Sequence, residues 1–220
     1  MTTEFIQTVL KKVTQAKPDI ICLTGDIVDG DPKFIQSKIE LLKNLQAPLG
    51  VFFVAGNHEY YWKINSILSE IKRLGIVVLE NSWQVIHRGQ AELLVAGIPD
   101  PAARMFGQQG PDWHAFLPAL KDSQQYRLVL SHQPHQAKAA AKVGFHLQLS
   151  GHTHGGQFFP WNLLIRTAQR YPRGHFKVQD LHLYVNEGTA YWGPAVRFGT
   201  KCEITEKVLL HPDENSEIKV

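Results

Sequence analysis

Cysteine is scarce in this chain of 220 residues, which contains only Cys22 and Cys202. Two distant cysteines exclude a disulfide framework and a cysteine-rich zinc knuckle. Cys22 lies inside a strand-like apolar run, and Cys202 lies close to a later one. Thiol chemistry therefore gives no indication of what the protein does.

Long apolar runs are also lacking, since no segment approaches the roughly 18 residues that a membrane span needs. The first residues show no secretory signal pattern. Hydrophobic residues make up 44% of the chain and charged residues 20%, which is ordinary for a globular protein. We therefore expect a soluble protein with one domain over residues 1–210, followed by a polar tail over 211–220 that frays.

Acidic residues are missing from the whole stretch between Ser123 and Gln179. The basic residues of that stretch are Arg127, Lys138, Lys142, Arg166, Arg170, Arg173 and Lys177. Two interpretations remain open, because the net charge of the chain is only +3. The stretch forms a positive surround that favours anionic substrates, or it is a basic face balanced by acids elsewhere in space. No motif indicates specific recognition of nucleic acid.

Polar motifs follow four strand-like runs of the chain. In order, they are GDIVDG after DIICLT, GNHEYY after GVFFVA, SHQP after YRLVL, and GHTHGGQ after the apolar positions 145, 147 and 149. Such runs are typical of strands buried on both faces, and polar groups just past their carboxyl ends meet at one rim. Glycines allow a tight turn, and neutral imidazole is a favoured ligand of transition metals. The motifs therefore predict a metal site.

Helices and strands alternate in the first half of the sequence. Apolar spacing predicts helices over residues 3–15, over 31–45 with Asp31 as N-cap and Pro32 as first residue, and over 64–74 ending at Gly75. A hairpin is expected around Gly89, and the later segments LHLYVN and EITEKVLL are strand-like. This order indicates two packed sheets with helices outside.

The ordered motifs resemble those of the calcineurin-like metallophosphoesterase superfamily. The chain is most similar to a bacterial, often membrane-associated branch with GHTHGGQ and a late Glu-Ile-Thr, here Glu203 to Thr205. The resemblance implies an α/β fold, a four-layer αββα sandwich of two mixed β-sheets flanked by helices. It implies hydrolysis of a phosphodiester or phosphomonoester with Mn, Zn or Fe ions. The substrate would be a small phosphorylated molecule, nucleotide or phospholipid-derived, and the parent protein would be associated with a bacterial membrane.

The resemblance also assigns roles to individual residues. One ion would be held by Asp26, Asn57, His132 and His152. The other would use Asp26 as a bridging ligand and His154, together with the Asp and His of a D-x-H motif.

Residues beside these ligands are assigned too. His58 would face the substrate and protonate the leaving oxygen, for which an imidazole pKa near 6.5 is suitable; the alternative is a structural histidine. We expect Asp29 to anchor its loop by local hydrogen bonds, and Glu59 to orient a loop or a ring. Aromatic residues after position 160 are as easily explained by the core, so none is assigned to the site.

The D-x-H motif is not found before the first predicted helix. The strings Asp112-Trp113-His114 and Asp180-Leu181-His182 occur elsewhere, and we interpret both as coincidences. The sequence therefore predicts that the first strand of the sheet is missing, leaving one tight and one weakened metal site. The alternative function is a truncated, weakly active or inactive phosphate- or metal-binding remnant. The strand DIICLT would have an unpaired edge, which favours a homodimer.

Overall fold

A computed structural model describes residues 2–121, 125–210 and 217–220 of the chain. The α-helices are α1 (Thr3–Ala16), α2 (Pro32–Ile39), α3 (Asn57–Tyr61), α4 (Ile64–Arg73), α5 (Ala137–Val143) and α6 (Trp161–Ala168). The strands are β1 (Ile21–Leu23), β2 (Val51–Phe53), β3 (Val77–Val78), β4 (Ser82–Arg88), β5 (Ala91–Ile98), β6 (Tyr126–Ser131), β7 (Leu147–Ser150), β8 (Gly174–Val178), β9 (Leu181–Val185), β10 (Val208–Leu210) and β11 (Glu217–Lys219). The 3-10 turns are η1 (Glu40–Asn44), η2 (Pro101–Phe106), η3 (Trp113–Phe116), η4 (Ala119–Lys121), η5 (Pro134–Gln136) and η6 (His154–Gly156).

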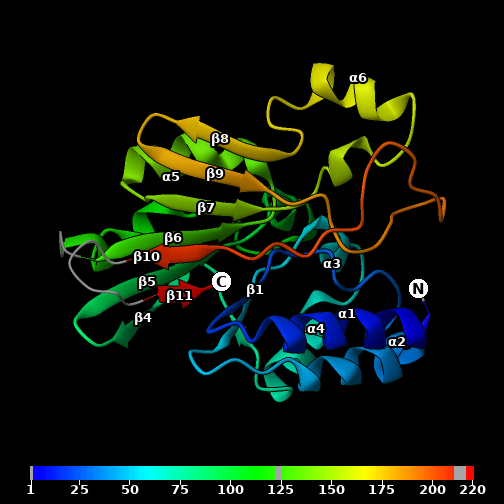
Figure 1. Cartoon of the computed structure of the whole chain (residues 1–220), viewed down its shortest axis with the longest axis horizontal. Coiled ribbons are helices and arrows are strands. Elements are labelled where there is room, and N and C mark those ends of the chain that lie inside the picture. Colours follow the sequence, from blue (N-terminus) through cyan, green and yellow to red (C-terminus); the bar gives the residue numbers. More distant parts are fainter. Residues whose placement is uncertain (1, 122–124, 211–216) are drawn as a thin grey trace.

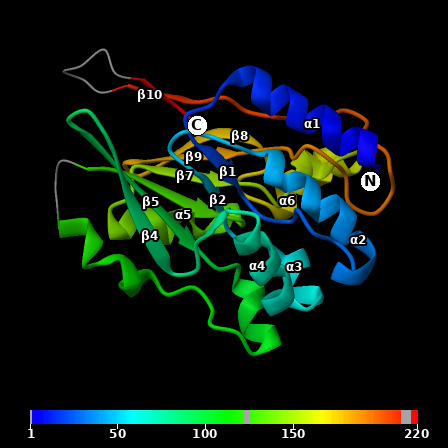
Figure 2. The same ribbon diagram turned by 90° about the horizontal axis from the view of Figure 1, so that it is seen from below.

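The smaller sheet has the strand order β1-β2-β3 and is parallel throughout. Helices α1, α2 and α4 lie on its outer side (Figures 1 and 2). Phe53 of β2 is fully buried among residues of these helices, including Leu10, Ile39 and Ile71. The apolar spacing of these helices predicted one buried face, and the structure buries that face of each helix against the sheet.

The larger sheet has the order β4-β5-β6-β7-β9-β8. Strands β5, β6, β7 and β9 are parallel, whereas β4 and β8 run antiparallel at the two edges. Helix α5 covers its outer face, where Ala137, Ala140 and Phe145 pack with Val129 and Leu183. The hairpin predicted around Gly89 is confirmed as the β4–β5 connection, in which Arg88 lies opposite Ala91.

A third core lies between the two sheets. Phe52 and Val54, which flank Phe53 along the chain, are fully buried there against Leu128 and Leu130 of β6. The strand is therefore buried on both faces, which explains its uninterrupted apolar run. The four-layer arrangement predicted from the sequence is confirmed. One detail is different, since only the larger sheet is mixed in the part that the structure describes.

The helix starts follow the predicted capping chemistry. Asp31 Oδ1 accepts a hydrogen bond from Lys33 N at 2.9 Å, with Pro32 as the first residue of α2. The helix predicted to reach residue 45 becomes the turn η1 after Ile39. Helix α4 ends just before Gly75, whose φ of 83° suits glycine.

The C-terminal segment corrects one expectation. Residues 217–219, expected to fray, form β11 and pair with β10, while residues 211–216 lie outside the described part. Lys219 O accepts hydrogen bonds from Asp19 N at 2.9 Å and Ile20 N at 3.0 Å. The entrance to β1 is thus covered by this segment. The homodimer predicted from a free edge at this strand stays a prediction.

Candidate metal centre

The four predicted strands end close together. Asp26 follows β1, Asn57 follows β2, His132 directly follows β6 and His152 follows β7. The first two strands belong to the smaller sheet and the other two to the larger sheet. The polar side chains therefore meet where the two sheets end, on the side to which the arrows of β7 and β9 point (Figure 1).

Short distances connect these side chains. His132 Nε2 lies 3.0 Å from Asp26 Oδ2 and 3.2 Å from His152 Nδ1, which in turn lies 3.0 Å from Asn57 Oδ1. Ligand atoms of Asp26, His132 and His152 all lie within 4.8 Å of one another. Two imidazole nitrogens, a carboxylate oxygen and an amide oxygen thus face one point, a donor set that fits a divalent transition metal.

Glycine and a buried glutamate shape the loop that carries Asp26. A Cβ on Gly56 would lie 2.2 Å from Asp26 Oδ1, so only glycine allows the two loops to approach so closely. Glu59 is fully buried and accepts hydrogen bonds from the backbone nitrogens of Asp26, Val28 and Gly56 at 2.7–2.9 Å. These bonds hold Asp26 in a left-handed conformation with φ of 55°. Glu59 therefore orients the loop, one of the two roles that the sequence left open.

The pKa values of the two histidines of the cluster shift in opposite directions. Burial would lower the pKa of His132, but the Asp26 carboxylate outweighs it and raises the pKa to about 9. For Asp26, burial is likewise outweighed by the His132 ring, and the pKa of Asp26 falls to about 2. Burial and the neighbouring His132 lower the pKa of His152 to about 4. Without metal, an ion pair between Asp26 and His132 thus occupies the centre, and His152 is neutral.

Metal binding is therefore expected to release about one proton near neutral pH, because His132 must lose its proton to become a ligand. His152 is already neutral there and releases none. The apparent affinity should rise about tenfold per pH unit until about pH 9 and then level off. Titration calorimetry in buffers of different ionisation enthalpy measures the proton directly. An affinity independent of pH, with no proton released, would contradict the assignment of His132.

His58 lies in the first turn of α3, beside Asp26. Its backbone N donates to Asp26 Oδ1 at 2.9 Å, and its ring Nδ1 lies 3.2 Å from Asp29 Oδ1. Trp62 Nε1 also donates to Asp29 Oδ1, at 3.3 Å. The expectation that Asp29 anchors its loop by local hydrogen bonds stays a prediction, but its carboxylate also reaches α3 and lies beside the His58 ring. Residue spacing gave no signal for this contact.

His154 stands apart from the cluster of Asp26, His132 and His152. Its Nδ1 lies 3.0 Å from Nη2 of Arg197, which also donates to the backbone oxygens of Glu187 and Ala190. Burial and the Arg197 charge lower the pKa of His154 to about 4. Sequence reasoning missed Arg197, because it lies in an irregular segment between β9 and β10 without periodicity or motif.

The late Glu-Ile-Thr motif supports this side of the site. Glu203 accepts hydrogen bonds from Tyr184 Oη and from Glu187 N, and Thr205 bonds Asn186 at 2.9 Å. The motif therefore fixes the end of β9 and the turn that follows it, where Gly188 lies beside the His154 ring.

A pocket opens beside these residues. Its lining consists of Asp26, His58, His152, Thr153, His154, Trp161, Ile165, Gln169 and Trp192. Two of the aromatic residues left unassigned by the sequence, Trp161 and Trp192, thus form pocket walls, whereas Tyr171 is buried in the core. Neither of the two other D-x-H strings lines this pocket: Asp112 caps η3, and the His182 ring stacks on His175.

Comparisons with known proteins agree with this geometry. Residues 2–156 match the family model of the calcineurin-like phosphoesterases. An uncharacterized metallophosphoesterase of Helicobacter pylori is 36% identical over 209 residues, which cover 94% of this chain and 55% of that protein. Uncharacterized metallophosphoesterase YkuE of Bacillus subtilis is 32% identical, with 93% and 72% covered. The chain therefore belongs to the calcineurin-like phosphoesterase family, whose members depend on metal ions.

The same fold occurs in solved structures of low sequence identity. Calcineurin-like phosphoesterase YfkN of Bacillus subtilis gives a TM-score of 0.53 at 14% identity, with 84% of this chain and 72% of that chain covered. NAD nucleotidase of Haemophilus influenzae gives 0.55 at 15% identity, with 84% and 43% covered. The chain spans about half the length of the first curated relatives that it matches. A Danio rerio relative, 32% identical, is named as a transmembrane protein with a metallophosphoesterase domain. No described helix of this chain is long and apolar enough to cross a membrane.

Proposed function

We propose that this chain hydrolyses a phosphodiester or phosphomonoester of a small molecule with the help of a divalent metal ion. The observation that best supports the proposal is the convergence of Asp26, Asn57, His132 and His152 on one point beside a pocket. A metal ion bound there would polarise a phosphoryl oxygen and supply an activated water. The alternative of an inactive remnant receives no support from this site.

The donor set favours one tight ion. Asp26, Asn57, His132 and His152 offer mixed nitrogen and oxygen ligation, which suits manganese, zinc or iron. A second ion beside His154 would be bound more weakly, because the Arg197 guanidinium lies against Nδ1 of that ring and repels a cation.

His58 is the proposed general acid. Its ring lines the pocket with Asp26 and His152, and its Nδ1 lies beside the Asp29 carboxylate, which holds the ring in place. The opposite nitrogen, Nε2, is then the atom that would give a proton to the leaving oxygen. A nucleotide or a phospholipid-derived phosphate ester would find aromatic walls in Trp161 and Trp192.

Turnover of an activated ester before and after metal removal tests the proposal. The chain is stripped with a chelator, reloaded with manganese, zinc or iron, and assayed on bis-nitrophenyl phosphate and nitrophenyl phosphate. We expect turnover to disappear with the metal and to return as the metal site is refilled. His114→Ala and His182→Ala are matched controls, because both side chains are exposed and outside the site; they should keep full turnover. Metal binding without hydrolysis of either ester would overturn the proposal.

A further inference from the structure

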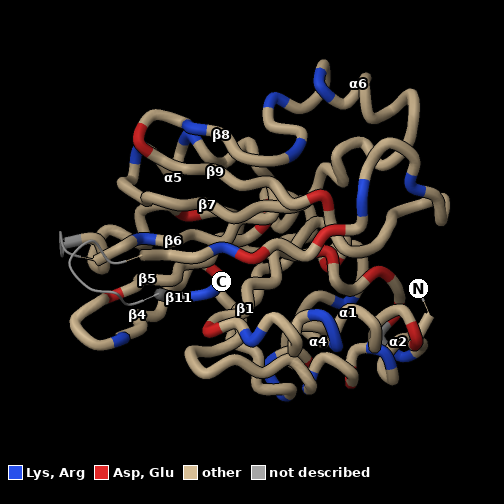
Figure 3. The backbone as a smooth tube through the Cα atoms, in the orientation of Figure 1, with Lys and Arg blue, Asp and Glu red and all other residues tan. Residues whose placement is uncertain are grey.

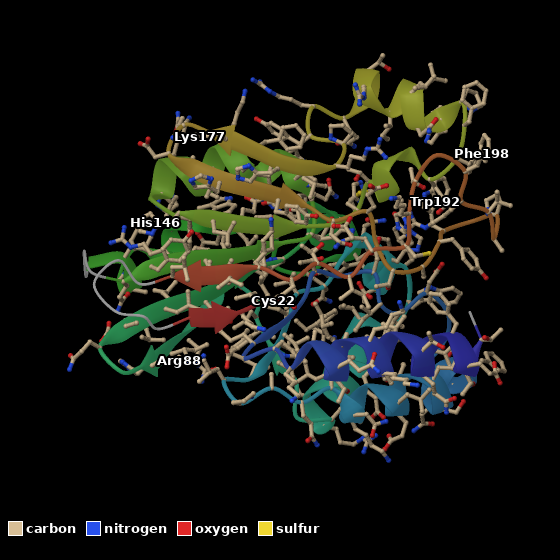
Figure 4. The ribbon with its side chains drawn as sticks, in the orientation of Figure 1. Cys22, Arg88, His146, Lys177, Trp192 and Phe198 are labelled. Carbon is tan, nitrogen blue, oxygen red and sulfur yellow. The ribbon has the colours of Figure 1, made fainter. Side chains whose placement is uncertain are left out.

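Large apolar side chains are exposed beside the pocket on two neighbouring segments, α6 with the residues before it and the loop between β9 and β10. These side chains, here called the apolar platform, are Phe159, Trp161, Leu163, Leu164, Tyr191, Trp192, Val196 and Phe198. Each is between 41% and 68% exposed. Figure 4 shows Trp192 and Phe198 at the same edge of the molecule. Single exposed apolar residues are common, but a contiguous group marks an interaction surface.

Hydrogen bonds of the Gln157 side chain, which is fully buried, connect the two segments of the platform. Its Nε2 donates to Trp192 O at 2.9 Å and to Pro194 O at 3.1 Å, and its Oε1 accepts from Trp192 N at 2.8 Å. Phe159 N donates to Phe198 O at 3.1 Å. The two halves of the platform are therefore held in a fixed arrangement by backbone bonds and by the side chain of the buried Gln157.

Positive charge surrounds the platform. Arg166, Arg170 and Lys201 are exposed on the same segments. Neither residues 158–179 nor residues 188–202 contain an Asp or Glu. Figure 3 shows Lys and Arg, without acidic residues, along α6 and its flanks. Around the platform, the acid-free stretch therefore presents a positive surround. Arg173 of the same stretch is different, because it is paired with Glu187.

Apolar and aromatic side chains flanked by arginine and lysine match the chemistry of an anionic bilayer surface. The apolar groups enter the boundary between head groups and acyl chains, tryptophan and tyrosine prefer that depth, and basic residues attract anionic head groups. Trp161 and Trp192 also line the pocket, so a bilayer in contact with the platform would lie at the mouth of the site.

We propose that the apolar platform docks this domain onto the surface of anionic phospholipid bilayers. Leu163 and Leu164 of α6, with Phe159 and Phe198, enter the boundary region. Arg166 and Arg170 contact the head groups. The proposal concerns binding alone and does not require the metal site to be active.

Vesicle flotation with the full chain tests the proposal. Vesicles of phosphatidylcholine and phosphatidylglycerol in equal parts are compared with vesicles of phosphatidylcholine alone. We expect binding to the mixed vesicles, weakened roughly tenfold or more in the double variant Leu163→Ser/Leu164→Ser, because two exposed leucines no longer enter the bilayer. Arg166→Ala/Arg170→Ala should weaken binding to the mixed vesicles by roughly tenfold and leave binding to phosphatidylcholine nearly unchanged.

Two control variants remove an exposed aromatic residue or two exposed positive charges outside the platform. Phe34→Ser deletes an exposed aromatic residue of α2, and Lys138→Ala/Lys142→Ala removes two exposed charges of α5. Both should bind mixed vesicles as the original chain does. Circular dichroism melting checks that every variant folds. Turnover of a soluble aryl ester by Leu163→Ser/Leu164→Ser should match that of the original chain, since neither leucine lines the pocket.

Three results would overturn the proposal. One is absence of binding to either kind of vesicle, and another is binding that Leu163→Ser/Leu164→Ser leaves intact. The third is a concentration-dependent dimer in solution that this variant abolishes, without vesicle binding, because the platform would then be covered by a second copy. Because flotation does not depend on catalysis, a chain without turnover can still confirm or refute docking.

Discussion

Asp26→Asn is expected to weaken metal binding by roughly 10²-fold or more and to reduce turnover with it, since even residues that only support a metal ligand contribute about 10–100-fold. The Asp26 carboxylate lies 3.0 Å from His132 Nε2 and is the one negatively charged donor of the cluster. Asparagine keeps the size of the side chain and tolerates the left-handed backbone at this position. Metal content by mass spectrometry and turnover of an aryl ester measure the two losses.

Asp112→Asn is the matched control, because it makes the same chemical change in a residue that caps η3 outside the site. It should keep both metal and turnover. Circular dichroism melting should show that Asp26→Asn remains folded. An Asp26→Asn chain that holds metal as tightly as the original would show that the cluster is not the metal centre.

His58→Ala should lower kcat by roughly 10²-fold or more while the metal content stays the same, since general acid catalysis is typically worth about 10²–10⁴. Alanine keeps the backbone N–H that bonds Asp26 Oδ1, so the loop geometry is preserved. The loss should be larger for an ester with a weakly acidic leaving alcohol than for a nitrophenyl ester, whose leaving group needs less protonation. Steady-state kinetics on both esters measures the difference.

Asp29→Asn separates positioning from proton donation. It removes the charge beside His58 Nδ1 but leaves the ring in the pocket, so we expect a smaller loss of kcat than in His58→Ala. The assignment of His58 fails if His58→Ala loses its metal, because the ring would then be a ligand. It also fails if both esters are affected equally.

The ends of the strands could be predicted because buried strands leave a strong sequence signal. Phe52 and Phe53 face opposite cores, and the run around them is apolar without interruption. Once such runs are placed in a parallel sheet, topology brings the polar residues that follow them to one rim. Asp26, Asn57, His132 and His152 meet for this reason, although no two of the four strand-end motifs are adjacent in the sequence.

The contacts made by irregular segments could not be predicted in this way. Arg197 and Asp29 reach the site through side chains from loops, and neither periodicity nor spacing specifies such contacts. The apolar platform was missed for a similar reason: an aromatic residue in a loop is as easily explained by the core. Its two halves are joined by hydrogen bonds of the buried Gln157 side chain, which only the folded chain reveals.

Strand boundaries near the C-terminus also differ from the prediction. The segment EITEKVLL is alternating enough for one long strand, but β10 covers only Val208–Leu210. The side chains of Glu203 and Thr205 bond Tyr184, Asn186 and the backbone of Glu187. The first part of the segment is therefore held by side-chain hydrogen bonds to the end of β9. Among the described residues, it does not pair with a neighbouring strand as β10 does.

A crystal structure of the chain soaked in manganese, with anomalous scattering recorded, tests the central claim most directly. The claim is that Asp26, Asn57, His132 and His152 form one tight metal centre. We predict one strong anomalous peak in contact with all four side chains, and a much weaker peak or none beside His154. An empty centre with the His132 and His152 rings turned apart, or a strong peak elsewhere in the molecule, would contradict the claim.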